Sequence, residues 1–408
     1  MTGVRVAVAR TGRRLEWGAA SRLANLVAGT RRTPPPGSPA MILNSARSIL
    51  VIRLDGAGDV VLTSAFLREL RRNAPSAVIT LVVAPAVLNL VELCPYVDRL
   101  LTFDPARRRF RPNTAVLGRA WTFAKQQLRN EPIDLAIVPR WDTDSYAGAF
   151  VACLSGAASR VTYSENVSAE KSRENHGLDD LFTTVFTERR EAHEATTCLR
   201  LIELLGGTVQ DTRLESWVDA QDEARASEIL SDASTGGSSS LVGLGVGAGD
   251  PKRKWPIERF GQVASKLINL GHRVVVLGGE PDRADGDQIA SGTGGVAISA
   301  AGRTTLRQTV ATLRHCNLFI GNDAGPMHMA SAAGVPVVEI SCHPAGGDPM
   351  HANSPVRFGP WQVRSAVLQP LAAGSCGPFC ESNRAHCINN VAAADVLKTA
   401  LKLLNASE

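Results

Sequence analysis

The residues from Gly321 to Ile340 (GNDAGPMHMASAAGVPVVEI) combine the side chains and backbone that an anionic ligand needs. Asp323, Gly325 and His328 fall in a turn between two apolar runs of strand length. Glycine and alanine let a ligand approach the backbone, and N–H groups at a helix start attract negative charge. The ring N–H of His328 could donate to the same group. This pattern predicts a diphosphate site; the alternative is an ordinary strand-to-helix turn with Asp323 as N-cap.

A second group of candidate ligands lies in the stretch GAGDPKRKWPIERF. Three cations, Lys252, Arg253 and Lys254, precede a Trp-Pro pair that indicates a helix start. Lys254 would therefore lie beside that helix start and beside the glycine turn at 247–249, where a diphosphate would gain charge-assisted hydrogen bonds. Lysines that only contact solvent are the alternative interpretation.

The candidate for proton transfer is Asp59, in the sequence DGAGD at residues 55–59. The dinucleotide-binding pattern G-x-G-x-x-G would need glycine at position 61, where Val61 stands, so a nicotinamide cofactor is not expected. A carboxylate at a glycine-rich helix start can accept a proton from a hydroxyl nucleophile. The alternative is a helix N-cap or first-turn acid that complements the helix dipole.

These candidates follow apolar strands that alternate with helical segments, a pattern typical of a doubly wound parallel sheet. The alternation occurs twice, so we expect two Rossmann-like domains in tandem, facing across a cleft, with ligands beyond the carboxyl ends of the strands. The predicted divisions are a basic extension and linker over 1–46, domains over 47–218 and 219–365, and a Cys-containing tail and helix over 366–408.

Length and charge support this organisation. The 408 residues exceed what one core usually serves, and 44% apolar with 20% charged residues is typical of a globular protein. Residues 1–40 hold seven arginines and no lysine against one acid, a charge of +6, which leaves 5 − 6 = −1 for the rest. A nearly neutral body argues against a nucleic-acid-binding surface.

The basic N-terminal region ends in the linker-like sequence TPPPGSP. Leu15, Ala19, Leu23 and Leu26 could form one face of a short helix that touches an anionic membrane surface; a disordered leader, or a start codon placed too early, is the alternative. The sequence contains no signal-peptide pattern and no apolar run of transmembrane length. We therefore expect a cytoplasmic body with possible peripheral contact at the inner membrane.

The eight cysteines are mostly scattered in apolar context, as expected of reduced, buried thiols. Cys376, Cys380 and Cys387 form a cluster, with His386 adjacent. Their spacing, C-x3-C-x6-C, fits no common structural zinc pattern, so we expect packing rather than a metal site.

Taken in order, several motifs resemble glycosyltransferase family 9, the ADP-heptose:lipopolysaccharide heptosyltransferases. They are ILVIRLDGAGDVVLTSAFLRELR, GVGAGDPKRKWPIERF, VVVLGGEPD, LFIGNDAGPMHMASAAGVPVV and the cysteine-bearing tail. The resemblance covers about residues 47 to 405. It implies a GT-B fold, with the acceptor bound by the N-terminal domain and the sugar nucleotide by the C-terminal one. It also implies inverting transfer that needs no metal or other cofactor.

The resemblance carries the family's site residues onto this chain motif by motif. Its catalytic aspartate falls on Asp59 and its donor-phosphate lysine on Lys254. Its phosphate turn falls on Asp323, Ala324, Gly325 and His328, and its ribose-contacting acid on Glu280. Ala324 replaces a serine or threonine, and the loss of one neutral hydrogen bond of about 0.5–1.5 kcal/mol would weaken donor binding without abolishing it.

The function that the resemblance implies is transfer of a sugar, heptose from ADP-heptose or another nucleotide sugar, to a glycan or glycolipid acceptor. Arg140, at the end of the predicted strand IDLAIVP, could meet an anionic acceptor or be an ordinary surface arginine. Two other classes share the architecture: a sugar-nucleotide epimerase and a catalytically silent sugar-nucleotide-binding or glycan-binding relative.

Overall fold

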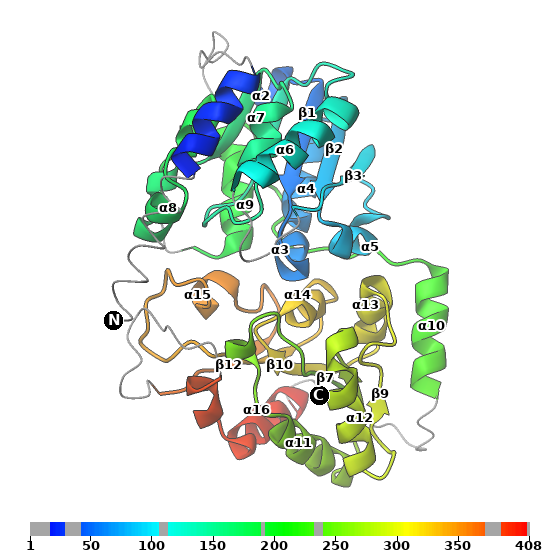
Figure 1. Ribbon diagram of the computed structural model, residues 1–408. Coiled ribbons are helices and arrows are strands. Elements are labelled where there is room, and N and C mark those ends of the chain that lie inside the picture. The colour runs from blue at the N-terminus through cyan, green and yellow to red at the C-terminus, as the bar shows by residue number, and fades with distance from the viewer. Residues whose placement is uncertain are drawn as a thin grey trace. The chain divides into compact units, whose positions relative to one another are not determined.

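The computed structural model describes residues 17–28, 42–105, 113–188, 192–231, 240–371 and 385–405. The chain forms two compact units, one mainly from residues up to Thr212 and one mainly from Arg213 onward (Figure 1). Each unit contains a six-stranded sheet, and the strand pairs in both sheets are parallel.

The first sheet has the strand order β3-β2-β1-β4-β5-β6. Its strands are β1 (Ser48–Arg53), β2 (Val78–Val83), β3 (Arg99–Thr102), β4 (Leu135–Val138), β5 (Ser159–Tyr163) and β6 (Thr184–Phe186). The chain starts at the centre with β1, runs outward to β3, and then returns to place β4 on the other side of β1. The strand order therefore reverses between β1 and β4.

The second sheet has the order β12-β11-β10-β7-β8-β9 and reverses between β7 and β10. Its strands are β7 (Leu241–Gly245), β8 (Arg273–Leu277), β9 (Ile298–Ser299), β10 (Leu318–Asn322), β11 (Val337–Ile340) and β12 (Ser365–Leu368). In open parallel sheets of this kind, ligands bind at the carboxyl ends of the strands where the order reverses.

Helices connect the strands. After a helix over residues 17–28, those around the first sheet are α2 (Ile42–Ser45), α3 (Ala57–Leu62), α4 (Ser64–Asn73), α5 (Leu88–Val91), α6 (Asn113–Phe123), α7 (Gly148–Leu154), α8 (Ala169–Glu174) and α9 (Glu194–Leu204). Those that follow are α10 (Ala220–Ser231), α11 (Ile257–Asn269), α12 (Arg283–Gly292), α13 (Leu306–Arg314), α14 (Gly325–Ala332), α15 (Pro355–Phe358) and α16 (Ala393–Asn405). None of the described helices is long and apolar enough to cross a membrane.

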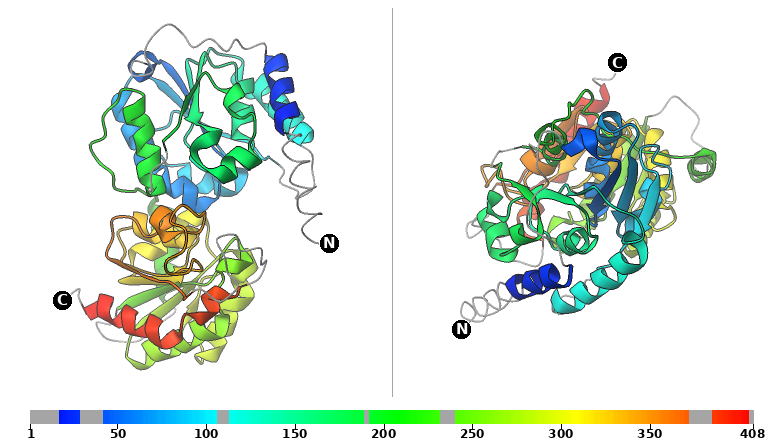
Figure 2. Two further views of the ribbon diagram at one scale, coloured as in Figure 1. Left: turned by 90° about the vertical axis from the view of Figure 1, so that its left-hand side faces the viewer. Right: turned by 90° about the horizontal axis from the view of Figure 1, so that it is seen from above.

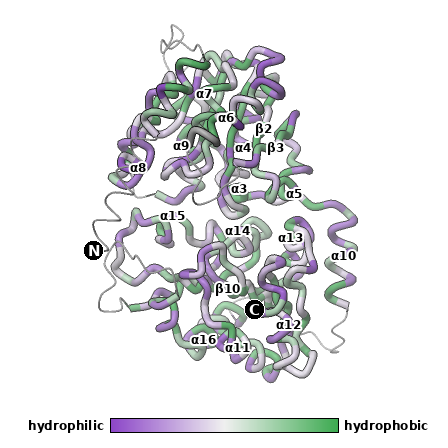
Figure 3. The backbone as a smooth tube through the Cα atoms, in the orientation of Figure 1, coloured by the Kyte–Doolittle hydropathy of each residue, from purple (hydrophilic) through white to green (hydrophobic). Residues whose placement is uncertain are grey.

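The central strands are almost wholly buried because helices cover both sheet faces. In the first unit α6 packs against α7, and α4 packs against α9. Residues 49–53 of β1 and 135–138 of β4 are all buried, and Figure 3 colours the strands mainly green for hydrophobic. The continuous apolar runs that predicted buried parallel strands are therefore confirmed.

Two local features add detail to the sequence analysis. The helical run after Asp59 is divided into α3 and α4 at Thr63, whose hydroxyl donates to the Asp59 carbonyl at 2.8 Å. The helix over residues 17–28 packs on the first unit beside α6 (Figure 2), with Trp17, Ala20 and Ala24 in the core. Trp17 stacks on Phe150 with the ring centroids 4.7 Å apart.

Candidate active site

The predicted base lies where the strand order of the first sheet reverses. β1 leads into Asp55 and Gly56, and Gly56 is the N-cap of α3 in extended conformation. Asp59 occupies the first turn of α3, so its carboxylate lies at the positive end of the helix dipole. Arg140 follows β4, the neighbouring strand, and the structure therefore brings Asp59 and Arg140 to the same sheet edge.

A buried arginine, Arg53, joins the acidic groups of this edge. Its guanidinium lies 3.1 Å from Asp55 Oδ2, donates to Asp59 Oδ1 at 3.0 Å, and lies 3.3 Å from Glu194 Oε1. It also donates to the Pro139 carbonyl at 3.0 Å, which ties the loop after β4 to β1. Sequence reasoning missed this residue, although a charge at the end of an apolar strand is a visible signal.

The charges of this cluster do not balance. Two guanidinium groups, of Arg53 and Arg140, face three carboxylates, of Asp55, Asp59 and Glu194, so full ionisation would leave 2 − 3 = −1. Burial raises the pKa of Asp55 to about 6, against the opposing pull of Arg140 and Arg53. Burial alone would lower the pKa of Arg53, but the neighbouring carboxylates outweigh it and keep the group charged.

Only one of these three carboxylates is accessible enough to meet an acceptor. The side chain of Asp59 is 26% exposed, whereas those of Asp55 and Glu194 are 4% and 2% exposed. Arg53 holds one oxygen of Asp59 and so orients the carboxylate toward solvent at a fixed angle. This geometry suits a group that accepts a proton from a bound hydroxyl.

Arg140 is largely engaged within the protein. It pairs with Asp55, donates from Nε to the Thr143 carbonyl at 2.6 Å, and lies 3.9 Å from Asp59 Oδ1. Its side chain is still 18% exposed, so contact with an anionic acceptor stays a prediction.

In the second unit, Asn322 at the end of β10 holds together the loops that were predicted to bind phosphate. Its side-chain amide donates to the Val246 carbonyl at 3.0 Å, and its side-chain oxygen accepts from the Trp255 N–H at 3.0 Å. The glycine turn after β7 and the loop before α11 therefore meet the turn at Asp323. The sequence did not single out Asn322.

The cation at the Asp323 turn is Arg253 rather than Lys254. Arg253 Nη1 lies 3.4 Å from Asp323 Oδ2, and His328 Nε2 lies 3.9 Å from Asp323 Oδ1. Lys254 Nζ instead donates to Asp282 Oδ1 at 2.6 Å. Arg253 is the last residue of the 3-10 turn over Pro251–Arg253, and Lys254 is its C-cap in extended conformation.

Asp282, the partner of Lys254, packs against two glycine turns. Its Oδ2 accepts from the Gly279 N–H at 3.0 Å. A Cβ added at Gly278 would lie 2.8 Å from Asp282 Cβ, and one at Gly247 would collide with the Asp282 carboxylate. Two glycine turns therefore need their glycines because this side chain fills the space between them. Glu280, the predicted ribose contact, is 71% exposed and pairs with Arg283 at 2.7 Å.

Ala324 is the N-cap of α14, where a serine or threonine hydroxyl would normally accept a backbone N–H. No side-chain cap bond is present at Ala324. Gly325 and Pro326 then open the helix, and His328 is buried in its first turn. The departure from the family pattern therefore falls on the N-cap of α14, where Ala324 offers no hydroxyl to a ligand at the helix N-terminus.

A buried acid, Glu339, lies on β11 opposite Gly321 of β10. Its side chain is 1% exposed. Burial raises its pKa well above the ordinary glutamate range, and the charge of Asp323 adds to that effect. Glu339 therefore takes up a proton more readily than an ordinary glutamate, next to the charges at the phosphate turn.

The cysteine cluster is only partly described. Cys376 and Cys380 lie outside the described residues, while Cys387 is buried with its Sγ 3.0 Å from His386 Nδ1. Over the described ranges, no group of three or more His, Cys, Asp or Glu side chains could hold a metal ion.

Comparisons with known proteins give a consistent result. The family model described as glycosyltransferase family 9 (heptosyltransferase) matches residues 123–369, more than half of the chain. The chain is 26% identical over 303 residues to the lipooligosaccharide heptosyltransferase 2 of Haemophilus ducreyi, covering 71% of this chain and 80% of that protein. It is 32% identical over 130 residues to the lipopolysaccharide heptosyltransferase 2 of Salmonella typhimurium, covering 30% of this chain but only 37% of that protein.

Solved structures show the same relationship. The glycosyl transferase family 9 protein from Veillonella parvula superposes with a TM-score of 0.72 at 25% identity, covering 92% of this chain and all of that one. The E. coli ADP-heptose lps heptosyltransferase II superposes with a TM-score of 0.62 at 20% identity, covering 88% and 99%. The predicted α/β fold of the GT-B type is therefore confirmed.

We predict that Glu339→Gln makes stability less sensitive to pH. The folded-state pKa of Glu339 is raised above that of the unfolded chain, near 4.3. Its contribution to stability is therefore fully present below pH of about 4.3 and is lost as pH rises toward the folded-state pKa. The melting temperature of Glu339→Gln minus that of wild type should increase from pH 4.5 to pH 8.

The matched control is Glu131→Gln, which removes a carboxylate that is 70% exposed. Its melting temperature should follow that of the wild type at every pH. A difference between Glu339→Gln and wild type that stays constant with pH would show that Glu339 is ionised in the folded protein.

Proposed function

The chain belongs to glycosyltransferase family 9, and we propose that it transfers heptose, with inversion and without a metal ion, from a nucleoside-diphosphate donor to a glycan hydroxyl. ADP-heptose is the proposed donor because the name of the E. coli structural relative specifies it. The acceptor is proposed to be a lipopolysaccharide-type glycan, following the names of the sequence relatives.

The observation that carries the proposal is the accessible carboxylate of Asp59 in an otherwise buried ionic cluster. In the proposed reaction Asp59 takes the proton from the acceptor hydroxyl as that oxygen attacks the anomeric carbon. The bond from that carbon to the diphosphate breaks, and the electron pair leaves with the diphosphate. A single displacement of this kind inverts the anomeric configuration.

The leaving diphosphate is assigned to the second unit. The guanidinium of Arg253, the ring of His328 and the N-terminus of α14 would stabilise its growing charge. Arg253 suits this role because arginine stays charged and can donate two parallel hydrogen bonds to phosphate oxygens. These hydrogen-bond donors support transfer without a metal ion.

We also propose that the helix over residues 17–28 provides peripheral contact with the inner membrane surface. Leu23, Leu26 and Val27 are 43%, 80% and 40% exposed, while Trp17 and Ala20 on the opposite side pack into the first unit. Apolar side chains presented beside a basic segment favour an anionic bilayer.

Leu26→Ser should reduce co-sedimentation with vesicles that contain anionic lipid, because the removed side chain would lie in the interface. It should leave the melting temperature unchanged, since Leu26 makes little contact with the protein. Leu270→Ser, at an exposed leucine of the second unit, is the control. Equal vesicle binding by Leu26→Ser and wild type would rule out this contact.

Asp59→Asn should abolish sugar transfer while leaving ADP affinity unchanged, because the amide keeps the shape but cannot accept the proton. General-base catalysis contributes about 10²–10⁴-fold, so the rate should fall at least a hundredfold. Transfer is measured by ADP release with acceptor present, and ADP affinity by calorimetry. Asp395→Asn removes a first-turn acid from α16 and controls for a pure helix-dipole effect.

Wild-type transfer by Asp59→Asn would reject the assigned base. Binding of ADP-heptose and glycan by a wild-type protein that never transfers sugar would instead identify a catalytically silent relative.

Arg253→Met should weaken ADP binding more than Lys254→Met. A charge-assisted hydrogen bond contributes about 1.5–3 kcal/mol, which corresponds to roughly tenfold or more in the dissociation constant. Lys254 is bonded to Asp282, so its removal should act through the loop and have a smaller effect. Lys252→Met, at a partly exposed neighbour, is the control, and calorimetric titration with ADP is the measurement. The opposite order would support the sequence prediction that Lys254 is the phosphate ligand.

A further inference from the structure

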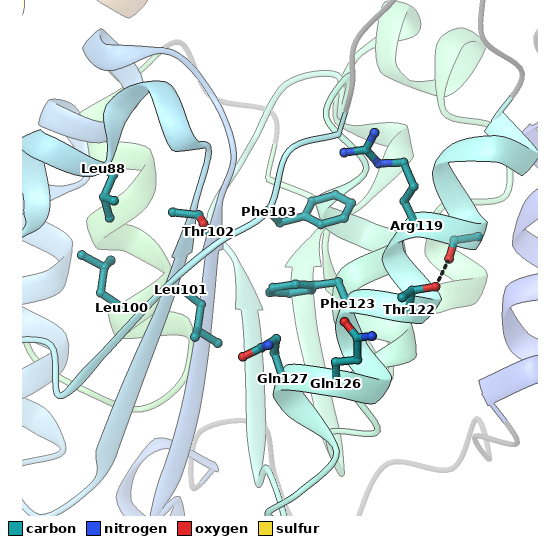
Figure 4. A pocket seen from close by; sticks show the side chains of 11 residues that line it. Leu88, Leu100, Leu101, Thr102, Phe103, Arg119, Thr122, Phe123, Gln126 and Gln127 are labelled. Atoms are coloured by element: carbon teal, nitrogen blue, oxygen red, sulfur yellow. Dashed lines mark hydrogen bonds between the residues drawn. The ribbon is translucent and has the colours of Figure 1, made fainter.

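A groove beside the edge strand of the first sheet is not used by the proposed chemistry. Its volume is about 780 Å³, and it is bordered by β3 on one side and by α6 with the π-helix Ala124–Leu128 on the other (Figure 4). The lining residues are Leu88, Leu100, Leu101, Thr102, Phe103, Gly118, Arg119, Thr122, Phe123, Gln126 and Gln127.

The groove is lined by aromatic side chains and by neutral side chains that can form hydrogen bonds. The rings of Phe103 and Phe123 lie 5.2 Å apart between centroids at the groove (Figure 4). Phe103 is only 4% exposed, so the partly buried ring of Phe123 is the one that a ligand would meet. The carboxamides of Gln126 and Gln127 and the hydroxyl of Thr102 belong to exposed residues of the wall. Sugars present C–H faces that pack on aromatic rings and hydroxyls that bond to amides.

The same lining disfavours an acyl chain or a phosphate group. A hydrocarbon chain would desolvate the two carboxamides without replacing their hydrogen bonds to water. The one cation of the lining, Arg119, donates to the Asp104 carbonyl at 2.6 Å and lies 3.4 Å from the Asp104 carboxylate. Its charge is therefore already compensated, and a neutral polar ligand fits best.

The π-helix is an independent sign of function at this wall. It is closed by the i→i+5 bond from the Arg129 N–H to the Ala124 carbonyl at 3.0 Å. π-turns are rare and occur mostly at functional sites. Here the widened turn places two successive glutamines on the same groove wall. Arg129 anchors its end by donating to the Leu154 carbonyl at 2.9 Å and by lying over the ring of Trp121 at 4.6 Å.

Part of the groove lining and the proposed base both follow the carboxyl ends of strands in the first sheet. Thr102 and Phe103 lie at the carboxyl end of β3, and Asp59 follows the carboxyl end of β1. β2 separates the two strands, so their lateral spacing is about 10 Å. A short oligosaccharide could therefore occupy the groove while another of its sugar units presents a hydroxyl to Asp59.

We infer that this groove is a second glycan subsite, which binds a neutral sugar unit of the acceptor remote from the reacting hydroxyl. The inference rests on the proposed function, in which the first unit binds the acceptor. It adds that acceptor selection depends on glycan length as well as on the sugar that is modified.

The test uses a full-length double variant in which both glutamines are replaced by alanine, Gln126→Ala and Gln127→Ala. Its activity is compared with that of the wild type on two acceptors. The long acceptor is O-deacylated lipopolysaccharide core oligosaccharide, and the short one is the methyl glycoside of its terminal sugar. With the long acceptor, KM should rise about fivefold or more with kcat nearly unchanged, as expected for two lost neutral hydrogen bonds. With the short acceptor, kcat/KM should not change.

Lys125→Ala is the matched control, because Lys125 is an exposed residue of the same π-helix outside the groove lining. It should behave as wild type with both acceptors. An unchanged KM for the long acceptor, or equal losses with both acceptors, would overturn the subsite.

Calorimetric binding of the core oligosaccharide separates this inference from the proposed function. If wild type transfers no sugar but binds the oligosaccharide, and the double glutamine variant binds it at least fivefold more weakly, the subsite stands and the function fails. If transfer occurs and depends on Asp59, but the double variant binds the oligosaccharide as wild type does, the function stands and the subsite fails. If neither the wild type nor the double glutamine variant binds the oligosaccharide, the subsite is rejected.

Discussion

The buried guanidinium of Arg53 is the interaction on which the first unit's site depends. It bridges Asp55, Asp59 and Glu194 and also holds the loop after β4. Removing one partner of a buried ionic cluster typically costs 3–5 kcal/mol because it leaves charges unpaired in a low-dielectric interior. The cluster therefore fixes the direction of Asp59 before any acceptor arrives, which limits the reorganisation that proton transfer would require.

The second unit fixes its loops with one neutral side chain and an ion pair beside it. Asn322 joins three loops through hydrogen bonds, and Asp323 pairs with Arg253 beside it. Burial raises the pKa of Glu339, on the neighbouring strand β11, well above its usual range. One unit thus keeps a surplus of negative charge at its sheet edge, while the other presents cations to a ligand that is itself an anion.

Sequence patterns predicted the fold because continuous apolar runs and glycine-rich turns are local signals. They also located the turns at Asp59 and Asp323. They could not pair Arg53 with Glu194, because the two residues are separated by 141 positions and no periodicity links them. Nor could they distinguish Arg253 from Lys254, adjacent cations that pair with different acids, Asp323 and Asp282. Glu339 could have been noticed in the sequence, because it is an acid inside an apolar strand.

The two strand orders have a consequence for biosynthesis. Read from β3 to β6 and from β9 to β12, the sheets follow the same path, and neither borrows a strand from the other. The first sheet is complete once Phe186 has been made, before any strand of the second exists. Domains generally fold as units and begin with the N-terminal one during synthesis. The strands of the first sheet can therefore pair with one another on the ribosome before β7 is made. The later strands then have fewer unpaired partners with which they could pair wrongly.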